Sequence, residues 1–254
     1  MLADARRRVE QILAVIAPAV TKLRISDLVE DYVIYQLERT EPAATIDTLL
    51  ANHGPLLAQI LRAEQAALST QQVRDALACQ LSFRDDDTII IDWNAAILVD
   101  TDADDLLAVL EYANVELLEM RYLDNQLDDA LDKSYSTLTR QTWSRKLLFG
   151  SYRNDLRRVA ELQVDGELLF EGVNNAIKLL GDQYLARVYR AASERLHLND
   201  WDANIIRKLQ TLESIYQKIS DHNAQQRLEV LEWIIIVLIA ISIIMPFFPA
   251  LSPH

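Results

Sequence analysis

One uninterrupted apolar run near the end of the chain constrains this sequence more than any other feature. From Trp233 to Leu251 the nineteen residues read WIIIVLIAISIIMPFFPAL, with no charge and with Ser242 as the only polar side chain. In a helix, a run of this length spans roughly 28 Å, close to the hydrocarbon thickness of a bilayer. A buried core helix is the alternative, although such a helix seldom lacks a polar face for so long. The run therefore predicts a transmembrane helix over residues 231–251.

The flanking residues set the expected orientation of this helix. Trp233 stands at its near edge, where an indole prefers the membrane interface, and Lys218 and Arg227 precede it while no Lys or Arg follows. We expect a single-pass protein with a cytoplasmic body in a bacterial inner membrane, with the mitochondrial inner membrane as the alternative. The side chains expected to contact the lipid bilayer are Trp233, Ile234, Ile235, Ile236, Leu238, Ile241, Phe247 and Phe248.

Composition favours long helices and an acidic surface in the remainder of the chain. Half of the 254 residues are hydrophobic, and only five Gly and six Pro interrupt them. The net charge of −13 is uneven: residues 1–139 carry 11 Lys/Arg and 25 Asp/Glu, a net of −14, and the rest carry 14 and 13, a net of +1. An acidic half of this kind repels nucleic acid. The single cysteine, Cys79, is interpreted as a small buried residue and excludes an intrachain disulfide.

The pattern divides the chain into four parts and predicts an α+β fold: an N-terminal helix (1–24), a small α+β head (25–100), a stalk of long antiparallel helices (101–230) and the membrane helix (231–251). In the head, a strand is expected over 31–37 and three short helices over 46–51, 56–67 and 70–79, with Gly54-Pro55 separating the first two and Ser69 capping the third. The segments 88–92 and 95–99 are expected to pair as a tight hairpin through Trp93-Asn94.

Three consecutive aspartates, Asp85 to Asp87, precede this hairpin and invite a metal hypothesis. Neighbouring residues of an extended segment point to opposite faces, and no glycine-containing calcium-loop pattern follows. We interpret them as a solvated turn.

Apolar residues at alternating spacings of three and four mark the stalk. The first series runs from Leu106 to Leu131, with Asp124 as its one polar interruption. The last helix is expected to begin at Asn199 or Asp200 and to continue into the apolar run. Its seam, expected to join copies of the chain in a homo-oligomer, is Ile205, Leu209, Leu212, Tyr216, Ile219, Asn223, Gln226 and Val230. A buried amide in such a seam fixes register; the alternative is that Asn223 and Gln226 meet water where the seam frays.

No motif for catalysis or cofactor binding is present. There is no glycine-rich phosphate loop, no His-Glu-x-x-His pattern and no nucleophile motif, and the four histidines are far apart. The sequence therefore predicts no enzyme activity, no cofactor and no metal site.

The segment Arg227 to Ile241, with its signature Leu231-Glu232-Trp233-Ile234-Ile235-Ile236, resembles the end of the required-for-meiotic-nuclear-division family. That resemblance implies a membrane-anchored oligomeric scaffold. The arrangement of an acidic head, long helices and a terminal apolar helix also resembles CorA-type magnesium channels, although that family needs a second span and a Gly-Met-Asn motif, whereas Met245 is followed by Pro246.

These features together predict a membrane-anchored, non-enzymatic scaffold or assembly protein that forms homo-oligomers and binds a protein partner through its head. The alternative is a divalent-cation-responsive protein related to CorA-type channels.

Overall fold

The structure, a computed structural model, describes residues 2–20, 23, 25–37, 46–84, 87–100, 103–141, 157–158, 160–162, 164, 166 and 183–244. The chain divides into two compact units, Met1–Asp31 and Tyr32–His254. The first unit contains helix α1 (Leu2–Ile16), followed by the 3-10 turn η1 (Ala17–Ala19). Asp4 in the first turn of α1 pairs with Arg7 and Arg8 one turn later, so ion pairs at helical spacing support the predicted N-terminal helix.

The second unit is built on a four-stranded sheet with the order β1-β4-β3-β2. The strands are β1 (Val33–Leu37), β2 (Gln80–Leu81), β3 (Thr88–Ile91) and β4 (Ala95–Val99). The predicted hairpin is confirmed, because β3 pairs antiparallel with β4 and Ile91 lies opposite Ala96. β1 adds in parallel to β4, with Val33 opposite Ala95, which requires the intervening helices as a crossover.

Both faces of the hairpin are buried, which explains why its sequence is apolar without alternation. Ile89, Ile91 and Leu98 face the larger core with the long helices, whereas Ile90 and Ile97 face a smaller core with the helix after β1. A continuous apolar run at this position therefore reflects a strand that is covered on both sides.

Helix α2 (Ile46–Leu61) and helix α3 (Thr70–Ala76) form the cover of the smaller core. The predicted break at Gly54-Pro55 is wrong, since α2 runs through Pro55. Burial of Leu57 and Leu61 against the sheet outweighs the one backbone hydrogen bond that Pro55 cannot donate. The predicted cap of the next helix is confirmed, because the Ser69 side chain accepts a hydrogen bond from the amide of Gln72.

Three helices cover the other face of the sheet and extend away from it: α4 (Asp104–Gln141), α6 (Gln183–Arg195) and α7 (Leu198–Ile244). The predicted seam of the first is confirmed, since Leu106, Leu110, Leu117 and Leu127 are buried. The apolar residues of α4 and α7 belong to one core with those of α6, so the long helices stabilise one another through a shared apolar stripe.

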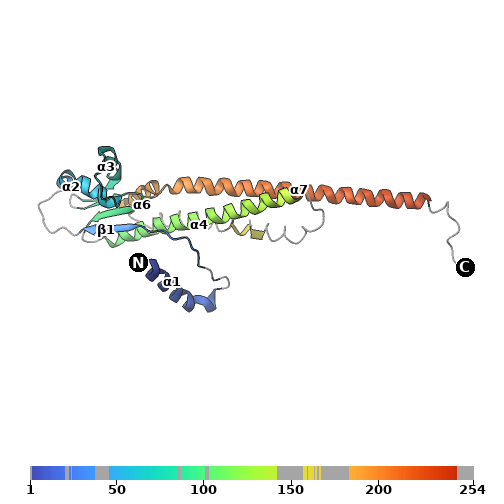
Figure 1. Cartoon of the computed structure of the whole chain (residues 1–254), viewed down its shortest axis with the longest axis horizontal. Coiled ribbons are helices and arrows are strands. Elements are labelled where there is room, and N and C mark those ends of the chain that lie inside the picture. Colours follow the sequence, from blue (N-terminus) through green and yellow to red (C-terminus); the bar gives the residue numbers. More distant parts are fainter. Residues whose placement is uncertain are drawn as a thin grey trace. The chain divides into compact units, whose positions relative to one another are not determined.

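The helices of the stalk alternate in direction along the chain, as the prediction of antiparallel helices requires, and the first and last of them consequently run the same way. Lys208 of α7 pairs with Asp124 and Asp128 of α4, and Asp202 of α7 acts on Glu116 of α4. Residue numbers therefore increase in the same direction along α4 and α7, so these two helices are parallel (Figure 1). The chain returns between them: α6 places Tyr189 at Glu116 and so runs against α4, with Arg158 earlier in the return bound to Gln126.

The predicted transmembrane helix over 231–251 is contradicted. Among the helices that the structure describes, none is both long enough and apolar enough to cross a bilayer. The described apolar part of α7 ends at Ile244 and begins at Trp233, and these residues span only about 18 Å against the roughly 30 Å of a hydrocarbon core. A longer stretch that also ends at Ile244 includes the charged residues Glu232, Glu229 and then Arg227. The lipid-contacting role and the single-pass localisation are corrected with it, while Phe247 and Phe248 lie outside the described residues.

Candidate functional site

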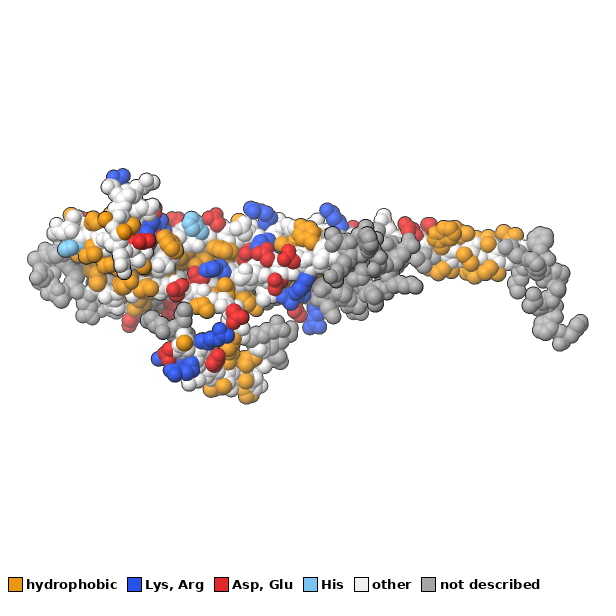
Figure 2. Space-filling model, in the orientation of Figure 1, with side chains coloured by type: hydrophobic (Ala, Val, Ile, Leu, Met, Phe, Trp, Pro, Cys, Tyr) orange, Lys and Arg blue, Asp and Glu red, His pale blue; other side chains and the backbone are white. Residues whose placement is uncertain are grey.

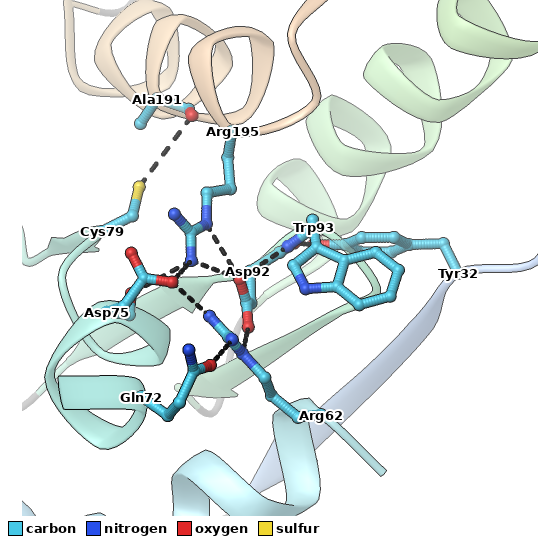
Figure 3. Close-up of polar contacts among 9 residues, drawn as sticks. All are labelled: Tyr32, Arg62, Gln72, Asp75, Cys79, Asp92, Trp93, Ala191 and Arg195. Carbon is cyan, nitrogen blue, oxygen red and sulfur yellow. Dashed lines mark hydrogen bonds and ion pairs between the residues drawn. The ribbon is translucent and has the colours of Figure 1, made fainter. Parts of the chain in front are cut away.

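A buried carboxylate, Asp92, lies where the β3–β4 hairpin meets three helices (Figure 3). Its side chain is completely buried. Arg62 reaches it from just beyond the end of α2, and Arg195 reaches it from the last residue of α6. The phenol of Tyr32, just before β1, donates a hydrogen bond to the Asp92 carbonyl at 2.9 Å. Residues up to 103 positions away in the sequence therefore converge on Asp92.

Both oxygens of the Asp92 carboxylate are occupied. The Arg62 Nε donates to Oδ2 at 2.8 Å, and the Arg195 Nε donates to Oδ1 at 2.9 Å. The backbone amide of Trp93 also donates to Oδ1, at 2.9 Å. Charge-assisted hydrogen bonds of this kind are roughly twice as strong as neutral ones. The two guanidinium groups therefore offset the desolvation of the carboxylate.

Asp75 of α3 lies on the solvent-exposed side of the cluster. Arg62 and Arg195 both pair with its carboxylate, and Arg62 also binds the side-chain oxygen of Gln72. Hydrogen bonds from Arg62 and Arg195 lower the pKa of Asp75 below its ordinary value. Two arginines and two aspartates sum to zero charge, so the cluster has no excess charge with which to attract an ion.

The geometry of the Asp92 cluster fits a structural role better than a catalytic one. Both oxygens of this carboxylate already accept hydrogen bonds from guanidinium groups, and the side chain exposes no surface on which a substrate could rest. The cluster instead ties α2, α3, the hairpin and α6 together at one point. The prediction of no enzyme activity stays a prediction.

The backbone conformation directly after Arg62 determines the direction of this side chain. Ala63 adopts a left-handed conformation with φ of 51°, and the amides of Ala63 and Glu64 donate back to Ile60 and Gln59. These two bonds end α2 in the manner of a Schellman cap. The chain turns sharply there, which leaves Arg62 at the helix end facing the hairpin.

A second buried carboxylate, Glu116 of α4, lies farther along the long helices and is 4% exposed. Its partner is the phenol of Tyr189 on α6, which donates to Glu116 Oε2. Burial raises the pKa of Glu116 to about 7, and the hydrogen bond from Tyr189 opposes that rise. Sequence reasoning missed this pair and the Asp92 cluster. The signal present in the sequence is a charged residue at a position where the surrounding apolar pattern predicts burial. Glu116 is such a residue in α4, and Asp92 is such a residue directly after β3.

The predicted oligomer seam divides into two parts. Ile205, Leu212 and Tyr216 are buried and Leu209 is half-buried, all within the core that the chain forms by itself. The side chains of Ile219, Asn223, Gln226 and Val230 lie outside the described residues. The register role of the two amides stays a prediction.

The end of α7 carries a continuous run of exposed apolar side chains (Figure 2). Its described large side chains are about half exposed or more, from 49% for Ile234 to 68% for Trp233. The eleven residues concerned are Leu228, Leu231, Trp233, Ile234, Ile235, Ile236, Val237, Leu238, Ile239, Ile241 and Ile243, which we call the apolar end of α7. Six of the residues predicted to contact lipid are among them.

The aspartate triplet and the cysteine differ in detail from their interpretations. Asp87 is buried and accepts hydrogen bonds from the amides of Phe83 at 2.7 Å and Arg84 at 3.1 Å, so it closes the turn from inside. Asp85 and Asp86 lie outside the described residues. Cys79 is half-buried at the edge of the larger core, and its thiol lies 3.9 Å from the carbonyl of Ala191.

Metal-ligand geometry is not found in the part of the chain that the structure describes, where no three His, Cys, Asp or Glu side chains are grouped to hold an ion. The prediction of a divalent-cation response gains no support from these residues.

The family model that matches this chain covers its N-terminal part, whereas the suspected family signature lies near the other end. Residues 1–105 match a family model described as uncharacterized protein MJ0711, N-terminal domain. Over 231 residues the chain is 23% identical to uncharacterized protein MJ0711 of Methanocaldococcus jannaschii, a match that covers 88% of this chain and 68% of that protein. No solved structure matches.

These matches contradict the resemblance to the required-for-meiotic-nuclear-division family. That resemblance depended on the short signature from Leu231 to Ile236, a mostly apolar helical stretch of a kind that unrelated proteins share. The matched family and the matched protein are relatives whose names state no activity.

Proposed function

We propose that this protein is a non-enzymatic assembly protein whose copies associate through the apolar end of α7. The observation that carries the proposal is the exposure of eleven large apolar side chains on the last described turns of that helix. Folded monomers rarely expose so large a contiguous apolar patch, and such patches mark interaction sites.

The free energy available at this surface is of the size that association requires. Complete burial of one large aliphatic side chain contributes about 1.5–3 kcal/mol, so covering eleven side chains that are about half exposed contributes roughly 10 kcal/mol or more. This is comparable with the roughly 4–15 kcal/mol that association costs in lost translational and rotational freedom. Several copies meeting at once would bury more of each helix.

The distribution of charge favours another copy of the same chain as the occupant. The protein carries a net charge of −13, so most surfaces of two copies repel. From Trp233 to Ile243 the sequence has no charge at all. Identical copies can therefore meet at this segment without electrostatic cost.

The shape of the apolar end favours more than two copies. Consecutive residues from Trp233 to Ile239 are exposed, and a helix turns by one full revolution in 3.6 residues. Apolar side chains consequently point in every direction, and a helix of that kind is stable only when surrounded. A pair of helices would cover one side of each, whereas a bundle covers more.

The test compares the mass of the full-length chain with that of the double variant Ile235→Glu/Ile239→Glu by sedimentation velocity over a hundredfold dilution. Two carboxylates per copy in a bundle of apolar helices are costly to bury, so the variant is expected to be monomeric while the native chain forms a defined oligomer. The control is Val115→Glu/Ile206→Glu, which places the same charges on α4 and on the earlier part of α7 at side chains of similar exposure. The control is expected to remain oligomeric.

Two outcomes would contradict the proposal. One is a native chain that stays monomeric throughout the dilution series. The other is a native chain that floats with phosphatidylcholine vesicles as single copies, because lipid would then be the occupant of the apolar end. Binding of a partner protein by the head stays a prediction, as does the response to divalent cations, which no observation here favours.

A further inference from the structure

Glu116 lies at the junction of three helices. It belongs to α4, its hydrogen-bond partner Tyr189 belongs to α6, and Asp202 on the first turns of α7 acts on it electrostatically. The ring of Tyr112, one turn earlier on α4, packs against the ring of Tyr189 with centroids 5.9 Å apart. A glutamate with 4% exposure therefore lies beside two phenols in an otherwise apolar core.

Among the residues that the structure describes, the groups that act on this carboxylate carry no positive charge. On its own helix these are Glu119 and Tyr112, on α6 Tyr189, and on α7 Asp202. Asp202 is itself poorly accommodated, because its Oδ1 is buried and accepts no hydrogen bond from the described residues. Burial raises the pKa of Asp202, as it does that of Glu116.

An ionised Glu116 is therefore unfavourable in the closed junction. Its charge faces two further carboxylates and is stabilised by a single phenolic hydrogen bond, whereas the neutral acid keeps that contact without the cost of a buried charge. Separation of α6 from α4 would hydrate the carboxylate, so ionisation favours an open junction and protonation favours a closed one.

We propose that Glu116 is a proton-dependent lock that holds α6 on α4, closed when the carboxyl is protonated and loosened when it is ionised. The proposal does not depend on assembly through the apolar end of α7. It is a device of the junction alone, and every group it uses lies within the second unit.

The junction at Glu116 is connected to the Asp92 cluster through α6. Six residues after Tyr189 the same helix presents Arg195, whose guanidinium holds Asp92 in the head. Loosening of α6 at Glu116 therefore reaches the cluster that ties the head to the long helices. The lock links the protonation state of one carboxyl to the attachment of the head.

The test is hydrogen exchange by mass spectrometry on the full-length chain at pH 5.5 and pH 8, with rates corrected for the intrinsic effect of pH. For a carboxyl with a pKa of about 7 when closed and about 4.5 when open, linkage predicts that opening of α6 increases by on the order of 10- to 30-fold between these pH values. Peptides of α1 serve as the internal reference, because α1 belongs to the other compact unit and supplies no residue to this junction or to the Asp92 cluster.

Three variants make the test specific. Glu116→Gln keeps the side-chain shape and an acceptor for Tyr189 but cannot ionise, so most of the pH effect on α6 is expected to vanish. Glu111→Gln removes an exposed carboxylate from the same helix and is expected to leave the pH effect intact. Tyr189→Phe removes the hydrogen bond that favours the ionised form, so the midpoint of the pH effect is expected to move upward.

The proposal is overturned if α6 exchanges equally at both pH values, or if Glu116→Gln keeps the native pH effect. A midpoint that does not move in Tyr189→Phe contradicts the role assigned to the phenol. Because each readout concerns α6 in every copy, these results are independent of the oligomer mass.

Discussion

Replacement of Asp92 by Asn tests whether the buried cluster fastens the head as the geometry indicates. The carboxylate is fully buried, and the side chains of Arg62 and Arg195 are only 13% and 21% exposed. Asn keeps the shape and one acceptor but carries no charge, and its amide hydrogens meet guanidinium donors. Two largely buried cations then lose their buried partner and keep only Asp75.

The magnitude follows from what breaking a buried pair costs. Removal of one partner destabilises a protein by about 3–5 kcal/mol, because the remaining charge is left uncompensated. The arginines keep some contact with water and with Asp75, so the lower end, about 3 kcal/mol, is expected here. A typical domain is stable by about 5–15 kcal/mol in total, so the loss is readily measured.

The assay is urea unfolding followed by far-UV circular dichroism, with the free energy of unfolding obtained by linear extrapolation. The matched control is Asp75→Asn, which makes the same change in the same cluster at a carboxylate that is 52% exposed. The control is expected to cost less than about 1 kcal/mol, as exposed pairs do. Equal losses in the two variants would refute the reasoning, because burial of Asp92 would then have no special weight.

Three further substitutions have defined outcomes in the same unfolding assay. Glu116→Gln should stabilise the protein by up to about 3 kcal/mol at pH 8, since a pKa raised from 4.5 to about 7 costs about 1.4 kcal/mol per unit once the group ionises; the gain should shrink as the pH falls from 7 to 4.5, and a pH-independent gain would contradict the assignment. Leu127→Ala, at a fully buried position of α4, should cost about 3–4 kcal/mol, and a loss below 1 kcal/mol would mean that this core is not packed as described. Ala63→Gly should gain about 0.5–1 kcal/mol by relieving the left-handed conformation, whereas a loss would show that the α2 cap is wrong.

Local sequence signals predicted the elements that depend on neighbours along the chain. The hairpin followed from β-branched runs on either side of Trp93-Asn94, the cap from Ser69, and the helix α4 from its spacing of leucines. Each of these is set by backbone preference and periodicity within a few residues. The break expected at Pro55 failed because burial of α2 against the sheet overrides local propensity.

Features that join distant segments could not be predicted in this way. Spacing of apolar residues shows that α4 and α7 pack, but it gives no direction, and the pairs of Lys208 with Asp124 and Asp128 show that they are parallel. Asp92 and Arg195 are 103 residues apart, and no local pattern connects them. The transmembrane prediction depends on nineteen residues that extend to Leu251, whereas the described helix ends at Ile244 and its apolar part is preceded by the charges at Arg227, Glu229 and Glu232.

The most direct test of assembly through α7 is a cysteine cross-link between copies at the apolar end. In a Cys79→Ala background the only thiol is the one introduced, at Ile239 or, as the control, at Ile206 in the same helix. Disulfides require Cα atoms within roughly 7 Å, so mild oxidation should give a covalent dimer with the cysteine at 239 and none with the cysteine at 206. Monomers at both positions, or equal cross-linking at both, would contradict the central claim.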